Sequence, residues 1–187
     1  MQSKFDFIIA AINDTQGTIR ATDVKVCALL AGMILPLPLI GRIWAHFVHI
    51  ADSILPCAAV IFGAVFFLMW VVIIVTLVKT ISAIDNPAHH IKNSHKFKGT
   101  FYGGGLYKFR LHDALFNRKN VVPLIDAISY SDTYPAEYDD INSELAFEHM
   151  KLIYIRDIKL FRLGVALEVA LLWLLIGIMV YVVSKLW

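Results

Sequence analysis

The chain has 187 residues, of which 58% are hydrophobic and only 17% charged, and its mean hydropathy is +0.67. A soluble domain of this size is nearer half apolar and a quarter charged, so the composition argues against a water-soluble enzyme. Seventeen Lys and Arg against fifteen Asp and Glu leave a net charge of +2, which by itself indicates no partner. We therefore expect an all-α integral membrane protein with a few spans and one small polar module.

The hydrophobic pattern divides the chain into four parts. They are an N-terminal amphipathic helix (1–22), a pair of transmembrane helices (24–78), a mainly helical cytoplasmic module that ends in a long helix (79–162) and a third transmembrane helix (163–187). We expect the first part to be a packing helix with no function of its own. Asp6 interrupts its apolar stretch and no small-x-small cleavage site follows, so we expect no secretory signal peptide.

Each transmembrane segment has about the 20 apolar residues that are needed to cross the hydrocarbon core. The segments are residues 24–47, 54–78 and 163–183. Pro36 and Pro38 lie in the middle of the first segment. Because proline has no backbone N–H, we expect a kink or a break there, with neighbouring helices satisfying the freed carbonyl groups.

The distribution of basic residues indicates the orientation. Residues 79–162 hold twelve of the seventeen Lys and Arg, whereas the loop after the first span has only Arg42 and the tail has only Lys185. By the positive-inside rule, we expect the N-terminus and the middle segment in the cytoplasm and the C-terminus outside.

The middle segment itself divides by charge. Residues 79–120 contain eight basic and two acidic residues, and residues 121–149 contain seven acidic residues and no Lys or Arg. Beyond Pro135 a helical pattern continues without Gly or Pro as far as Gly164. We interpret it as one long helix that enters the third span directly, so that movement of residues 140–160 would also move the membrane helix.

The basic part of this segment mixes cationic and aromatic side chains around a triple glycine at residues 103–105. Cations meet phosphates and aromatic rings stack on bases, so this composition is typical of nucleotide or single-strand binding. The candidate nucleotide-binding residues are Lys96, Lys98, Phe101, Tyr102, Tyr107, Lys108, Arg110, Arg118 and Lys119. The alternation over residues 106–112 suits a short strand, and a β-hairpin could turn at the glycines. A cluster that faces anionic lipid headgroups is an equally good interpretation of these residues alone.

No pattern among the remaining residues indicates an enzyme. His89, His90 and His95 have no nearby cysteine and no metal-motif spacing, so we expect a structural or solvated role and no bound metal or cofactor. No nucleophile-and-base pattern occurs, so we assign no catalytic residue and do not expect an enzyme.

Glu168 is the one ionisable residue well inside a span. Charges there are costly and by default face a bundle interior or an aqueous path, and a ring of carboxylates would favour cations. Apolar residues just beyond it could form a dewetting constriction. The candidate pore residues are therefore Glu168, Leu171, Leu172 and Leu175. The alternative is a Glu168 that is solvated near the interface or paired with a residue such as Lys25.

Small residues recur four positions apart in each span, which lets helix backbones approach closely in lipid. The pairs are Ala28 and Gly32, Ala59 and Gly63, and Ala166 and Ala170. On the third span they lie on a different face from Glu168, so one face can pack while another lines a path. Three spans alone enclose little, and we therefore expect a homo-oligomer, with a tetramer favoured.

Short motifs at residues 21–30, 100–103, 140–146 and 151–159 carry a resemblance to a known family. With the order of the helices, they make residues 5–183 resemble the small transmembrane effectors of bacterial anti-phage systems, the Pycsar-type and SLATT-type proteins, including the Hailong-type channel effector. The resemblance implies an ion channel or pore of the bacterial inner membrane that acts in abortive infection. It also implies control by the product of a partner cyclase or nucleotidyltransferase, a cyclic pyrimidine mononucleotide in Pycsar systems and a short DNA oligomer in the Hailong system. The length of the basic and aromatic stretch favours an oligonucleotide.

The expected function is thus an oligomeric inner-membrane channel, controlled by a nucleotide or oligonucleotide signal. Two other functions stay open, a membrane adaptor that recruits a protein through its cytoplasmic module and a small lipid-modifying or transport protein. An adaptor would leave liposomes sealed. An enzyme would need a polar cluster at one membrane depth, where only Glu168 is available.

Overall fold

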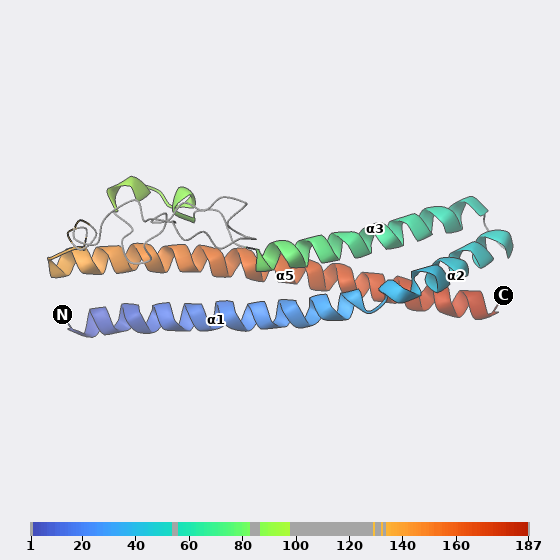
Figure 1. Cartoon of the computed structure of the whole chain (residues 1–187), viewed down its shortest axis with the longest axis horizontal. Helices are drawn as coiled ribbons and strands as arrows, with labels where there is room; N and C mark the ends of the chain where they lie inside the picture. The colour runs from blue at the N-terminus through green and yellow to red at the C-terminus, as the bar shows by residue number, and fades with distance from the viewer. Residues whose placement is uncertain are drawn as a thin grey trace, which may run out of the picture. The chain divides into compact units, whose positions relative to one another are not determined.

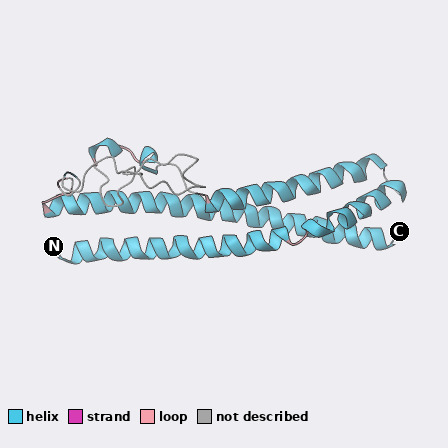
Figure 2. Ribbon diagram, in the orientation of Figure 1, coloured by secondary structure: helices cyan, strands magenta, loops and turns pink. Residues whose placement is uncertain are grey.

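The computed structural model of the chain describes residues 2–53, 56–82, 87–97, 129, 132 and 134–186 (Figure 1). Regular structure in these residues is helical, and no strand occurs among them (Figure 2). The elements are α1 (Gln2–Ile34), α2 (Ile40–Ser53), α3 (Pro56–Ile81) and α5 (Tyr138–Leu186), with short 3-10 helices η1 (Leu37–Leu39), η2 (Pro87–His90) and η3 (Ser94–Lys96). The expected all-α class is confirmed for this part of the chain. The β-hairpin expected at residues 103–105 lies outside the described residues.

Three helical stretches are long and apolar enough to cross a membrane, and each overlaps one of the expected spans. They are Lys4–Ala51, which includes the α1–α2 break, Ala59–Ile81 and Tyr138–Leu186. Their length and composition fit a membrane protein with transmembrane helices. The long helix expected to run from the acidic segment into the third span is confirmed, because α5 continues for 49 residues.

The N-terminal helix extends further than expected. α1 does not stop near residue 22 but continues to Ile34, into the first span. No residue between Gly17 and Ile34 removes a backbone N–H, and a single glycine costs a helix only about 1 kcal/mol. The hydroxyl of Thr22 donates to the carbonyl of Thr18, 2.8 Å away, which keeps this polar side chain satisfied on a helical backbone.

The described chain clusters into two compact units, and α1 and α5 contribute residues to both. Unit 1 comprises residues 1–16 and 86–154, and unit 2 comprises residues 17–85 and 155–187. In unit 1, the rings of Phe97 and Phe147 stack with centroids 4.7 Å apart. Unit 2 holds the three expected spans, and within it α2 and α3 pack as an antiparallel hairpin (Figure 1).

The break in the first span follows from its prolines. Pro36 offers no N–H to the carbonyl of Gly32, which instead accepts from the N–H of Leu35 at 3.3 Å. The next carbonyl, that of Met33, accepts a buried hydrogen bond of 2.8 Å from Nε1 of Trp70 on α3. A neighbouring helix therefore satisfies a carbonyl that the break leaves free, as expected for a proline in an apolar span.

Aromatic rings fill the core of unit 2 beside this break. Phe66 stacks on Trp173 with ring centroids 4.8 Å apart, and the rings of Trp70 and Trp173 lie 6.3 Å apart and nearly parallel. Phe47 of α2 packs against Phe66, with centroids 5.5 Å apart. The aromatic cluster thus joins α2, α3 and α5 in one packed core.

Two of the three small-residue pairs allow this packing inside the chain. Ala166 and Ala170 of α5 are almost completely buried. A Cβ added at Gly63 would lie 2.9 Å from the ring of Trp44 and 3.2 Å from that of Phe47, so only glycine lets α2 approach α3 this closely. The pair on α1 differs, because Ala28 and Gly32 are exposed and nothing lies within 4 Å of a Cβ built at Gly32.

We predict that Trp70→Phe destabilises the protein by about 1–3 kcal/mol, because the buried Met33 carbonyl then has no donor. Unfolding of the full-length protein in mild detergent, followed by circular dichroism, measures the effect. Trp44→Phe is the matched control, since the Trp44 indole donates no hydrogen bond within the described residues. Equal loss of stability in the two variants would show that ring volume, not the hydrogen bond, matters at Trp70.

Candidate pore face and polar belts

The four candidate pore residues lie on one outward face of α5. Glu168, Leu171, Leu172 and Leu175 are spaced i, i+3, i+4 and i+7, which places them on adjacent turns of one helix face. All four are exposed, and the three leucines expose 61%, 52% and 56% of their surface. We call these four residues the α5 stripe. It lies on a different face from the buried Ala166 and Ala170, as expected.

Glu168 carries a charge on this stripe without a counter-charge in the chain. Neither Glu168 nor Lys25 has an ion-pair partner among the described residues, so the pairing considered for them is not formed. Glu168 lies six residues beyond Arg162 on α5, about 9 Å along the helix axis. Its carboxylate therefore belongs to the apolar part of the helix.

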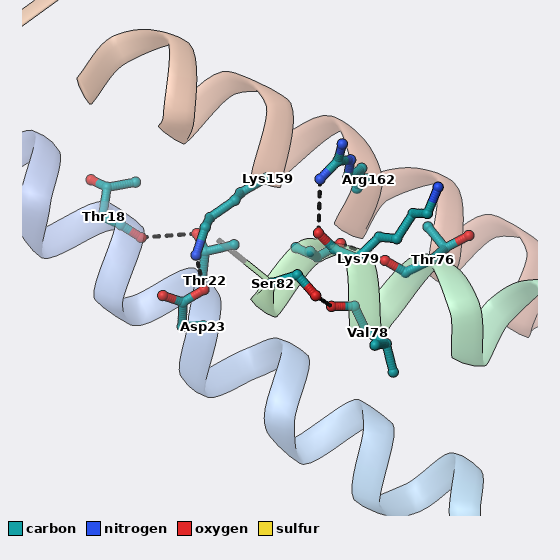
Figure 3. Close-up of polar contacts among 10 residues, drawn as sticks. Thr18, Thr22, Asp23, Thr76, Val78, Lys79, Ser82, Lys159 and Arg162 are labelled. Atoms are coloured by element: carbon teal, nitrogen blue, oxygen red, sulfur yellow. Dashed lines mark hydrogen bonds and ion pairs between the residues drawn. The ribbon is translucent and has the colours of Figure 1, made fainter. Parts of the chain in front are cut away.

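A belt of polar contacts joins α1, α3 and α5 where the apolar segments of α1 and α5 begin and that of α3 ends (Figure 3). Nζ of Lys159 lies 2.5 Å from Oδ1 of Asp23, and the lysine side chain is only 9% exposed. A buried ammonium needs such a partner, because an unpaired charge in an apolar site is strongly disfavoured. The contact ties the third span to the first at a fixed level.

Arg162 ties α5 to the end of α3 in the same belt. Its Nη1 donates to the backbone carbonyl of Lys79 at 2.8 Å, two residues before α3 ends (Figure 3). The last carbonyls of a helix lack intrahelical donors and carry partial negative charge, so a guanidinium is a favourable cap. Ser82 contributes from the following turn, where its hydroxyl donates to the carbonyl of Val78 at 2.8 Å.

A second polar level lies at the other end of unit 2. The hydroxyl of Ser184 on α5 is 2.9 Å from Nδ1 of His46 on α2, and the ring of Tyr181 meets the His46 ring edge-on. Nineteen residues separate Arg162 from Tyr181, about 28 Å of helix. The hydrocarbon core of a bilayer is about 30 Å thick. The two polar levels therefore match the two boundaries of a membrane.

Neither the pairing of Asp23 with Lys159 nor the contact of Arg162 with α3 was predicted from the sequence. A signal was present, because Asp23 immediately precedes the first apolar run and the two basic residues immediately precede the third. Their pairing depends on which helices are neighbours and on their rotation, and a periodic pattern in one chain does not specify either.

Of the nine candidate nucleotide-binding residues, only Lys96 belongs to the described part of the chain, at the end of η3. The other eight lie outside it, namely Lys98, Phe101, Tyr102, Tyr107, Lys108, Arg110, Arg118 and Lys119. Their role stays a prediction from the sequence.

Unit 1 contains a buried carboxylate on α5, well before the expected span. Glu148 is fully buried, its Oε1 accepts from Nζ of Lys151 at 2.6 Å, and its Oε2 has no hydrogen-bond partner within the described residues. Burial raises the pKa of this carboxyl, and Lys151 partly opposes the rise. The next residue, His149, lies 3.2 Å from the hydroxyl of Thr15, which joins α5 to α1 inside unit 1.

The histidines considered for metal binding lie on η2 and η3. The ring of His90 stacks on that of Tyr154 at 4.4 Å, a packing contact. Within the described ranges, no three His, Cys, Asp or Glu side chains gather as a set of metal ligands.

We predict that the two partners of the belt ion pair respond differently to mutation. Asp23→Asn leaves the buried Lys159 ammonium without its counter-charge, whereas Lys159→Met replaces the buried charge by an apolar chain of similar length. Asp23→Asn should therefore lower the free energy of unfolding by about 1–3 kcal/mol more than Lys159→Met does. Detergent unfolding of both single variants and the double variant gives the coupling energy. A coupling energy of zero would mean that the pair contributes nothing to the fold.

Comparison with known proteins adds no relationship to this geometry. No family model matches the chain. Searches of curated proteins and of solved structures also find no match.

Proposed function

We propose that the protein is an oligomeric ion channel of the bacterial inner membrane, in which the α5 stripe lines the ion path. The observation that carries the proposal is Glu168, a carboxylate without a counter-charge on the outward face of an apolar helix. A charged side chain costs roughly 2.5–3.5 kcal/mol at the centre of a spanning helix by insertion scales, and Glu168 lies about 9 Å toward that centre from Arg162. Contact with water in a path between several copies relieves this cost.

An assembly of identical chains would enclose an ion path, which three helices of one chain cannot do. Unit 2 uses the opposite side of α5 for its own core, so the stripe is free to face an axis shared by several copies. A ring of Glu168 would attract cations, and the leucines one and two turns further would narrow the path with apolar surface. A homotetramer is the assembly that we favour.

A nucleotide signal is the proposed control. The basic and aromatic stretch at residues 96–119 has the composition of a nucleotide or oligonucleotide site, and a partner cyclase or nucleotidyltransferase would make the ligand. The helix α5 contributes to both compact units, which supports a covalent route from the ligand to the pore. The positive-inside rule supports a cytoplasmic N-terminus and middle segment. In this role the protein would act in anti-phage defence by abortive infection.

The test of this function is ion flux from liposomes that contain the purified protein, with and without short DNA oligomers and cyclic pyrimidine mononucleotides. A channel releases ions, and one of the ligands changes the rate. Liposomes that stay sealed under every condition would reject the channel and favour a membrane adaptor.

For the pore we predict that Glu168→Gln folds and inserts but loses cation preference. The substitution removes the charge with little change in volume, so the reversal potential under a salt gradient should move toward zero. An unchanged ratio of cation to anion permeability would show that this carboxylate lies away from the path.

Leu172→Ser should make the closed channel leaky, because a hydroxyl helps water to enter an apolar constriction. Leu68→Ser is the matched control, since Leu68 is 63% exposed against 52% for Leu172 but lies on α3, away from the stripe. Basal flux should rise in Leu172→Ser alone. The same leak in both variants would indicate a general loss of packing.

For the ligand we predict that Arg110→Glu weakens nucleotide binding and lowers the slope of log affinity against log salt by about one. Lys92→Glu makes the same change of charge outside the predicted site and should bind normally. Fluorescence titration at several salt concentrations measures both effects. Identical salt slopes for Arg110→Glu and the wild type would exclude Arg110 from phosphate contact.

A further inference from the structure

A cavity of about 600 Å³ opens in unit 2 beside the proline break. Leu35 and Pro36 border it on the side of the break, α2 forms a second wall, and Leu174, Gly177 and Ile178 of α5 form the opposite one. The cavity lies where the chain leaves α1 after Ile34 and passes through η1 into α2. Its volume is within the range of about 300–1,000 Å³ that is typical of small-ligand sites.

The lining is apolar except at one end. Arg42, His46 and Tyr181 provide its polar side chains, and no acidic residue lines the cavity. His46 already contacts Ser184, so Arg42 is the group without a partner. Its guanidinium is exposed and forms no ion pair within the described residues.

Arg42 lies four residues, about one helical turn, before His46 on α2, and His46 belongs to the polar level at the end of unit 2 opposite the Asp23–Lys159 belt. It lines the cavity together with Tyr181, which is about 28 Å along α5 from Arg162. An arginine at this level extends its head toward the phosphate groups of the bilayer and keeps its stem in apolar surroundings. The apolar part of the cavity extends from there toward the centre of the membrane, where Phe66 and Trp173 border it.

We propose that the cavity is a binding site for one phospholipid, with an acyl chain in the apolar part and the phosphate on Arg42. Charge complementarity favours this occupant, because Arg42 requires an anion and the lining supplies none. Several exposed side chains of α3 and α5 in this half of unit 2 are apolar, among them Ile61, Phe62, Met179 and Val182, and such a surface on a second copy would offer Arg42 no anion. The proposal does not depend on channel activity.

Native mass spectrometry of the full-length protein, released from nanodiscs of phosphatidylglycerol, tests the site. The wild type should retain one phospholipid per chain. Arg42→Gln should lower the retained fraction about tenfold, as expected for the loss of a charge-assisted contact. Lys185→Gln removes the other basic residue near this end of unit 2, which does not line the cavity, and should retain the lipid. Leu174→Trp, at a lining position that is 52% exposed, should fill the cavity and exclude the lipid without disturbing the core.

Three results would overturn the proposal. In the first, the wild type carries no phospholipid, so the cavity does not bind one. Equal losses in Arg42→Gln and Lys185→Gln would indicate non-specific attraction of lipid to positive charge. A photoreactive side chain at Leu174 that links two copies of the protein, with no lipid adduct, would assign the cavity to a contact between copies.

Discussion

The arrangement of unit 2 depends on one requirement, that no backbone carbonyl in an apolar span is left without a donor. The prolines in the first span make this requirement acute, because they end α1 where water is excluded. Trp70 meets it by donating to the Met33 carbonyl, which fixes the position of α3 against the break. The stacked rings of Phe66, Trp70 and Trp173 then hold α5 against α3. The Trp70 side chain thus takes part both in the hydrogen bond at the break and in the aromatic core.

Two sets of polar contacts mark the two ends of the apolar part of unit 2. At one end, Lys159 pairs with Asp23 and Arg162 caps α3, so three helices share one boundary. At the other end, the contact between His46 and Ser184 joins α2 to α5. The length of α5 between these levels agrees with the thickness of a hydrocarbon core. Glu168 lies between these two levels, about 9 Å along α5 from Arg162, and Arg42 lies one turn of α2 from His46.

Some of the small residues in the spans are buried in contacts within the chain, and others remain exposed. Ala59, Gly63, Ala166 and Ala170 are used for packing inside unit 2. Ala28 and Gly32 on α1 remain exposed, as does the α5 stripe. In the proposed assembly, a close approach between copies would therefore use α1, which leaves the α5 stripe for the proposed path. This division suits an assembly whose packing surface and pore surface lie on different helices.

The sequence by itself determined the helical class, the three apolar spans, the break at the prolines and the continuity of the last helix, because each depends on local composition and on the period of one helix. It also identified Glu168, since one charge in an apolar run is visible without coordinates. Only the tertiary structure decided three points. Trp70 donates to the carbonyl at the break, Asp23 pairs with Lys159, and Glu168 forms no ion pair with Lys25. These contacts join residues more than 30 positions apart, and they depend on which helices are neighbours and how each is rotated. The cavity beside Arg42 has the same origin, because it forms only where a broken helix packs against two unbroken ones.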